Sequence, residues 1–311
     1  MIRWSVLFAT LCILLAGTLS PASAQDTYSL EYKFVPGELI RYKMVIDMNM
    51  SMKFDGTTAQ KATGSMQMPN MQMSMVIVTR QRTKKVLPNG DGQIAMAIES
   101  MKVVDPTGKT QQMPTKDLPV FTIVMGKNGV VKSVSGLEAL QKSLSKNVPG
   151  GGKMPAFNPG EFNQLMGQYA VFPSVPVPLG QAWVVDIPYP VGTGSIRVMS
   201  TFQSIDEKAG QKLANLRQQY DGDIGYGMQM EIPESQQSKG GTANIQLAGK
   251  LQGDTTVDFA LDKGHVRSMN GTIGMQMGVD FSATGGGESG GGTASIDMVM
   301  QMQMFKLPSG K

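Results

Sequence analysis

The sequence has very little cysteine, histidine or tryptophan. Its 311 residues include one cysteine, Cys12, one histidine, His265, and two tryptophans. One thiol and one imidazole cannot supply a disulfide, a cysteine and histidine zinc site, or a multi-histidine metal centre. No sequence motif marks a serine nucleophile that could act with His265. We therefore expect a protein that is not an enzyme, and the sequence indicates no cofactor.

The chain also lacks a large excess of charge of either sign. The formal net charge is +4, and charged residues make up 17% of the chain. No basic block suggests nucleic acid as a partner. After residue 24, no apolar run is long enough to span a bilayer, so no integral membrane segment is expected in the mature chain. Nothing in the sequence indicates an oligomeric state.

The first 24 residues have the pattern of a secretory signal peptide. Arg3 precedes an apolar run from Val6 to Leu19, and the small-residue site Ala22-Ser23-Ala24 follows. A membrane anchor is the alternative, but this run is shorter than the roughly 20 residues that a spanning helix needs. We expect cleavage near Ala24, which removes Cys12, and a soluble protein in the periplasm or outside the cell.

The rest of the chain is rich in strand and turn signals. Runs with alternating or β-branched residues, such as 39–54 and 296–307, are typical of half-buried strands. Pairs of Asn or Asp with Gly accept the positive φ angles of tight hairpins. Six pairs are expected as turns: Asp55-Gly56, Asn89-Gly90, Asp91-Gly92, Asn128-Gly129, Asp221-Gly222 and Asn270-Gly271. The prediction is a mainly β protein with a large curved antiparallel sheet or half-barrel.

Two short helices are expected near the middle of the chain, packed on one side of the sheet. The segment 135–149 begins at a capping Ser135, places leucines on one face and ends at Pro149. The segment 158–172 begins with Asn158-Pro159 and carries an apolar stripe.

A faint internal repeat suggests two related modules. Residues 121–136 and 256–271 share a strand, a basic-Gly turn, a second strand and a closing glycine, and 36–44 resembles 179–187. The expected organisation is a signal peptide (1–24), an N-terminal β-module ending in a helix (25–147), a linker with a short helix and a Pro-rich connector (148–180), and a C-terminal β-module (181–311).

Three short segments resemble an uncharacterised family of secreted bacterial proteins. They carry Tyr32, Phe34, Gly37, Arg41 and Tyr42, then Val177, Gly180 and Trp183, then Phe259, Gly264 and Val266. The resemblance implies a β-rich secreted protein and brings no catalytic residues. More loosely, the chain is similar to the half-barrels of periplasmic lipoprotein carriers and to mycobacterial lipid-binding lipoproteins, which implies an acyl-chain ligand by analogy of fold alone.

Methionine is the most unusual feature of the composition. The chain has 26 methionines, and many recur at every second position, as in "SMQMPNMQMSM" (65–75). Residues two apart in a strand share a face, so each group should line one side of the sheet. Pro69-Asn70 interrupts the alternation between Met68 and Met71, as a turn or bulge would.

Three interpretations of this face follow. Methionine can simply fill the core of a structural cell-envelope protein. Alternatively, unbranched and polarizable side chains form an adaptable surface that binds an apolar small molecule or lipid, which is the function we favour. The candidate ligand-binding residues are Met44, Met48, Met50, Met52, Met71, Met73, Met75, Met298, Met300, Met302 and Met304.

The third interpretation is a periplasmic Cu(I) site. Thioether sulfur is a soft donor that suits Cu(I), and Met66, Met68, Met71 and Met73 offer four sulfurs in a short span. The spread of methionines over five or more predicted strands argues against one compact cluster, so this remains the third choice and no metal site is assigned.

Overall fold

The computed structural model describes residues 26–55, 68–105, 107–116, 118–136, 139, 170–188, 193–208, 210–232, 241–285 and 288–308. Its strands in chain order are β1 (Thr27–Tyr28), β2 (Leu39–Asp55), β3 (Met68–Val86), β4 (Gly92–Val104), β5 (Thr110–Met113), β6 (Phe121–Met125), β7 (Val131–Ser135), β8 (Val177–Pro178), β9 (Ala182–Pro188), β10 (Thr193–Lys208), β11 (Gln211–Ile232), β12 (Gly241–Ala260), β13 (His265–Gly285) and β14 (Glu288–Lys306). No helix long and apolar enough to cross a membrane occurs in these ranges.

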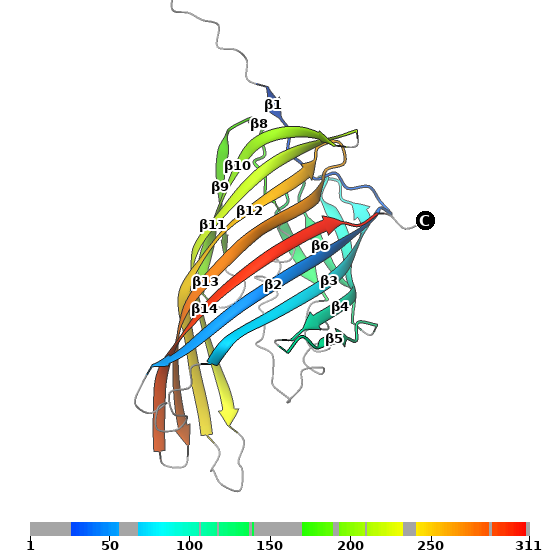
Figure 1. Ribbon diagram of the computed structural model, residues 1–311. Coiled ribbons are helices and arrows are strands. Elements are labelled where there is room, and N and C mark those ends of the chain that lie inside the picture. The colour runs from blue at the N-terminus through cyan, green and yellow to red at the C-terminus, as the bar shows by residue number, and fades with distance from the viewer. Residues whose placement is uncertain are drawn as a thin grey trace, which may run out of the picture.

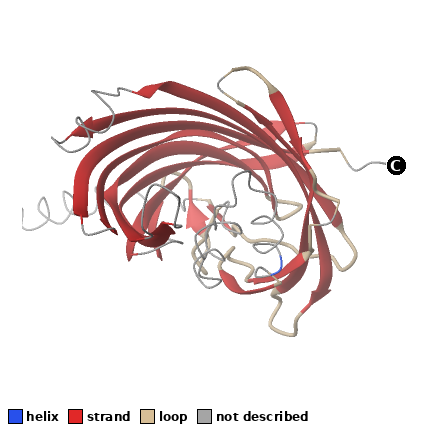
Figure 2. Ribbon diagram, turned by 90° about the horizontal axis from the view of Figure 1, so that it is seen from below, coloured by secondary structure: helices blue, strands red, loops and turns tan. Residues whose placement is uncertain are grey.

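One 12-stranded antiparallel sheet contains most of these strands. Its order is β7-β6-β4-β3-β2-β14-β13-β12-β11-β10-β9, with β5 paired to β4. Strands β2 and β14, from opposite ends of the chain, lie side by side at its centre (Figure 1). Within the described residues β7 and β9 do not pair with each other, so the sheet is curved and open (Figure 2). The prediction of a mainly β fold with a large antiparallel sheet is confirmed.

The strands in the C-terminal half are longer than the turn signals predict. The pairs Asp221-Gly222 and Asn270-Gly271 lie inside β11 and β13, so their assignment as hairpin turns is wrong. Both glycines sit where the neighbouring strand comes close. A Cβ atom on Gly222 or Gly271 would overlap backbone atoms across the ladder. These glycines serve close packing between strands.

The two predicted helices, 135–149 and 158–172, lie for the most part outside the described residues. Ser135, expected as a helix cap, is the last residue of β7, and Ala139, within the expected first helix, is helical. The rest of that segment lies outside the described residues, so the first helix is not confirmed. Ala170 to Phe172, expected as the end of the second helix, lie in a connector without helix or strand. Ala170, Val171 and Phe172 are buried against the sheet.

The concave side of the sheet carries the main core. Two covering segments, residues 26–38 and 170–181, pack onto one end of this side and pair with each other through β1 and β8. Figure 2 shows loop segments within the curve of the sheet. The rings of Tyr32 and Phe172 meet Phe259 of β12 at centroid distances of 5.3 and 4.7 Å. Edge-to-face packing of this kind fixes the covering segments on the concave side.

Two glycine turns hold the first covering segment. The Tyr32 N–H donates to the carbonyl of Lys127 at 2.7 Å, in the turn between β6 and β7. The next residue, Lys33, donates its N–H to the carbonyl of Gly264 at 3.1 Å, in the turn between β12 and β13. The segment therefore connects two hairpins that lie several strands apart in the sheet.

Candidate functional site

Four adjacent strands bring the methionines together in rows. On the concave side, the register aligns Met71 of β3, Met50 of β2, Met298 of β14 and Met275 of β13. Residues directly opposite each other in an antiparallel pair have Cβ atoms about 4.5–5.5 Å apart. This first row therefore places four thioether side chains next to one another across the sheet.

A second row lies two residues along the strands. It consists of Met73, Met48 and Met300, and continues into Ile273 of β13. The next positions pair Ile46 with Met75 and Met302, and beyond them Met44 pairs with Met304. All eleven candidate residues except Met52 belong to these rows. Met52 lies opposite Met68 and Ile296. We refer to this surface as the methionine face.

Exposure changes along the methionine face. Met304 and Met269 are buried beneath the covering segments, with 1% and 6% of their surfaces exposed. Farther along the strands, Met48, Met50, Met71, Met298 and Met300 are only partly buried, and Met73 is 39% exposed. One end of the face is thus part of a filled core, and the other end retains exposed apolar surface.

The convex side of the same strands is polar. Asp47, Asn49, Gln72, Gln301 and Gln303 alternate with the methionines and are exposed. This alternation fixes the register, because a shift by one residue would place these polar groups on the concave side. The pattern of even spacings in the sequence therefore predicts the face correctly.

A bulge restores the alternation at Pro69-Asn70. Strands β2 and β3 pair Met50 with Met71 and then Met52 with Met68, which is a register shift. The interruption in the sequence is thus an irregularity within β3, as expected of a bulge. Of the four residues considered for copper, Met71 and Met73 lie in separate rows. Met66 and the side chain of Met68 lie outside the described residues.

The contribution of β13 was missed from the sequence. Met275 completes the first row, and Met277 lies one position farther along the same face. Their even spacing was visible, but nothing in the sequence shows that β13 lies beside β14 in this register. Both residues also pack against a buried cluster that includes Leu251 of β12, the residue paired with Met275.

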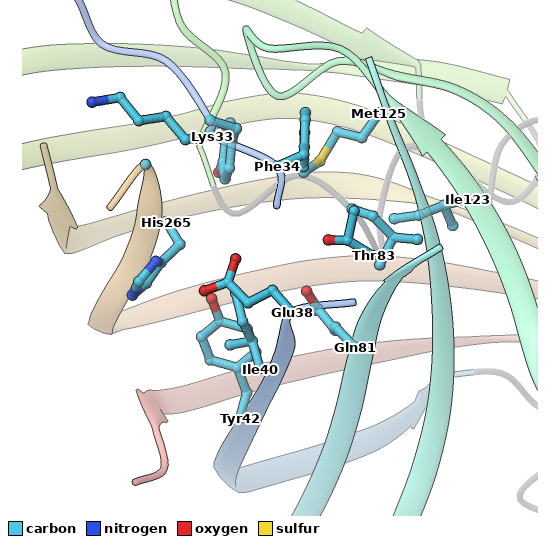
Figure 3. A pocket seen from close by; sticks show the side chains of 13 residues that line it. Lys33, Phe34, Glu38, Ile40, Tyr42, Gln81, Thr83, Ile123, Met125 and His265 are labelled. Carbon is cyan, nitrogen blue, oxygen red and sulfur yellow. The ribbon is translucent and has the colours of Figure 1, made fainter. Parts of the chain in front are cut away.

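A small hollow that opens to solvent adjoins the buried end of the methionine face. Figure 3 shows side chains from β2, β3, β6 and the start of β13 around it. Its walls are largely apolar and include Phe34, Ile40, Ile94, Ile123 and Met125, together with Tyr32, Lys33, Glu38, Tyr42, Gln81, Thr83, Gly264 and His265. No sequence pattern predicts this hollow, because the segments that line it are far apart along the chain.

His265 lies at the hollow as a neutral ring. It is 5% exposed, and burial together with the neighbouring Lys306 ammonium lowers its pKa to about 4. The Lys306 Nζ lies 2.9 Å from Nε2, so Nε2 accepts and Nδ1 carries the proton. The backbone of Lys263 raises the pKa of His265, against the larger lowering effects. The buried Nδ1 has no hydrogen-bond partner among the described residues.

No cluster of three or more His, Cys, Asp or Glu side chains occurs in the described ranges. The methionine face offers thioethers and hydrocarbon, and the hollow offers a few hydrogen-bonding groups in an apolar wall. This arrangement suits binding of apolar or soft ligands.

Neither family models nor curated protein sequences match the chain. Among solved structures, it is similar to a Salmonella typhi OmpF complex with daunomycin at 6% identity and a TM-score of 0.23, covering 89% of this chain and 100% of that one. Pseudomonas aeruginosa OccK11 (OpdR) matches at 8% identity and a TM-score of 0.21, covering 92% and 100% of the two chains. At these TM-scores the likeness bears on neither the fold nor the function.

Proposed function

We propose that this protein is a non-enzymatic, secreted or periplasmic binding protein that carries an apolar ligand, such as a lipid, on the methionine face. The observation that supports this most is the assembly of methionines from β2, β3, β13 and β14 into adjacent rows that stay partly exposed. Contiguous apolar surface of this kind in a secreted protein is typical of a binding site.

The chemistry of methionine favours a ligand that varies in shape. Its unbranched side chain has three rotatable bonds, so the rows can repack around acyl chains that differ in length or saturation. Leucine or valine in the same positions would hold a fixed surface. The hollow beside the buried end supplies polar groups, such as Glu38 and Thr83, for the head of an amphiphile.

The modular origin expected from the sequence has support in the hydrogen bonding. Gly37, with φ +83°, precedes β2, and Gly180, with φ +80°, precedes β9. The Gly37 N–H donates to the carbonyl of Thr83 on β3 at 2.8 Å, and the Gly180 N–H donates to that of Phe202 on β10 at 2.7 Å. We infer two related modules, joined where β14 pairs with β2.

The test is to identify what the purified protein carries. Native mass spectrometry after export to a bacterial periplasm should detect a bound lipid, and denaturing extraction should identify it. A dansyl-labelled fatty acid then measures affinity. We expect the double variant Met48→Gln/Met300→Gln to bind this probe roughly tenfold more weakly, equivalent to about 1.4 kcal/mol, because it places amides in the apolar rows.

The matched control is Met48→Leu/Met300→Leu, which keeps the surface apolar and should bind the probe nearly as well as the original chain. Circular dichroism checks that each variant folds. A protein that carries no lipid and binds no probe would overturn the proposal. It would favour the alternative of a structural cell-envelope protein whose core is filled.

A further inference from the structure

The methionines are spread along the sequence, which argues against a soft-metal site, but the sheet brings them together in rows. Met50 of β2 lies between Met71 of β3 and Met298 of β14. In the next row Met48 lies in the same way between Met73 and Met300. With Met275 of β13 beside Met298, the first row presents four thioethers, and the second row presents three.

The spacing of the strands allows the sulfurs of one row to converge. Neighbouring strands are about 4.8 Å apart, and directly paired Cβ atoms are about 4.5–5.5 Å apart. Each methionine has three rotatable bonds, so the outer two sulfurs of a row can swing toward the sulfur on β2. The residues involved are partly buried or exposed, so an ion can reach them from solvent.

The donor set selects the metal. Thioether sulfur is neutral and soft, which suits Cu(I) and not Mg²⁺, Ca²⁺ or Zn²⁺. Carboxylates such as Asp47 lie on the convex side, away from these sulfurs. A singly charged ion is also cheaper to hold beside apolar residues than a doubly charged one. The geometry points to a Cu(I) site of three methionine sulfurs centred on Met48 or Met50 of β2.

This site goes beyond carriage of an apolar ligand and needs only the sulfur atoms. Leucine removes the sulfur donor and keeps the side chain apolar, so leucine variants test whether the sulfur atoms bind the metal. The decisive variant is Met48→Leu/Met50→Leu. It leaves Met71 of β3 two strands, about 9–10 Å, from Met298 of β14, and Met298 keeps only Met275 of β13 beside it, so neither row retains three adjacent sulfurs.

The experiment is an anaerobic titration of the bicinchoninate complex of Cu(I) with the purified protein, followed by the loss of colour of that complex. We expect the original chain to withdraw Cu(I) and Met48→Leu/Met50→Leu to lose this uptake. The matched control is Met101→Leu/Met113→Leu, which removes a single cross-strand pair between β4 and β5. This control should withdraw Cu(I) like the original chain.

A second readout does not depend on variants. X-ray absorption of the copper-loaded protein should show sulfur as the only ligand type. The inference is overturned if the original chain withdraws no Cu(I), if Met48→Leu/Met50→Leu withdraws as much as the original, or if nitrogen or oxygen ligands dominate the spectrum. Binding of the dansyl fatty acid by the leucine variant, measured in parallel, reports on the apolar function separately.

Discussion

At the scale of single residues, the pKa of His265 is strongly lowered. Its ring is neutral because burial and the Lys306 ammonium oppose a second positive charge, and Arg267 and Lys263 add to this effect. Burial lowers the pKa of Lys306, and the Glu38 carboxylate raises it, which favours the charged ammonium. The imidazole therefore serves as an acceptor for Lys306 at the edge of the hollow.

The lowered pKa of His265 predicts acid sensitivity. As the pH falls below about 6.5, the unfolded chain binds a proton on this residue, but the folded protein binds it only near a pKa of about 4. The free energy of unfolding should therefore decrease between pH 6.5 and 4, by up to about 3 kcal/mol from this group, and the loss should level off below pH 4.

The measurement is direct because the chain has one histidine. The proton resonance of that single ring, followed by NMR against pH, gives the folded pKa without assignment. Urea unfolding of His265→Gln, whose amide oxygen can still accept from Lys306, supplies the non-titrating reference. A folded pKa near 6.5, or equal pH dependence in both proteins, would contradict the prediction.

At the scale of elements, the turns determine how the sheet is covered. Gly264 has φ +63°, and a Cβ atom there would overlap the backbone nitrogen of Lys33 in the covering segment. Gly210 has φ +70°, but a Cβ atom there would meet nothing within 4 Å. The two glycines thus share a backbone conformation and differ in what surrounds them.

Alanine variants of these two glycines therefore measure the cost of backbone strain with and without a packing clash. Gly210→Ala should cost about 1–2 kcal/mol for the left-handed conformation alone. Gly264→Ala should cost at least about 2 kcal/mol more, because the covering segment must move away from the turn. Urea denaturation midpoints of the two variants test this. Equal losses would mean that the contact between Gly264 and Lys33 contributes nothing to stability.

Sequence patterns predicted the faces of the elements better than their ends. Parity alone placed Met44 to Met50 on one side and detected the irregularity at Pro69-Asn70, because side-chain direction in a strand is a local property. The same local reasoning failed at Asn270-Gly271. Whether such a pair turns or continues depends on the strand packed beside it, and Thr255 of β12 occupies that place.

At the scale of the whole molecule, the two expected modules form one structure. Pairing of β2 with β14 continues the sheet from one half into the other over residues 42–55 and 293–306. This pairing joins the two ends of the chain, so no local pattern predicts it. The methionine rows and the hollow both depend on it, which is why the sequence indicated the residues and not their assembly.

A continuous sheet predicts a single unfolding transition. Trp183 lies in β9, and its indole N–H donates to the carbonyl of Val171 at 2.8 Å. Its fluorescence reports on the C-terminal half, whereas circular dichroism reports on the entire sheet. We expect both signals to change at the same urea concentration. Gly129→Ala, in the β6–β7 turn of the other half, should shift both midpoints together. Separate transitions would indicate two independently folding units.

The open sheet also has a mechanical consequence. A closed barrel has a radius set by its strand number and stagger, whereas an arc that ends at β7 and β9 can flatten or tighten without breaking a ladder. Tyr32 bonds the β6–β7 turn and the adjacent Lys33 bonds the β12–β13 turn, so these two residues tie together hairpins on two sides of the hollow. We expect one residue inserted between them to let the sheet flatten and the hollow widen.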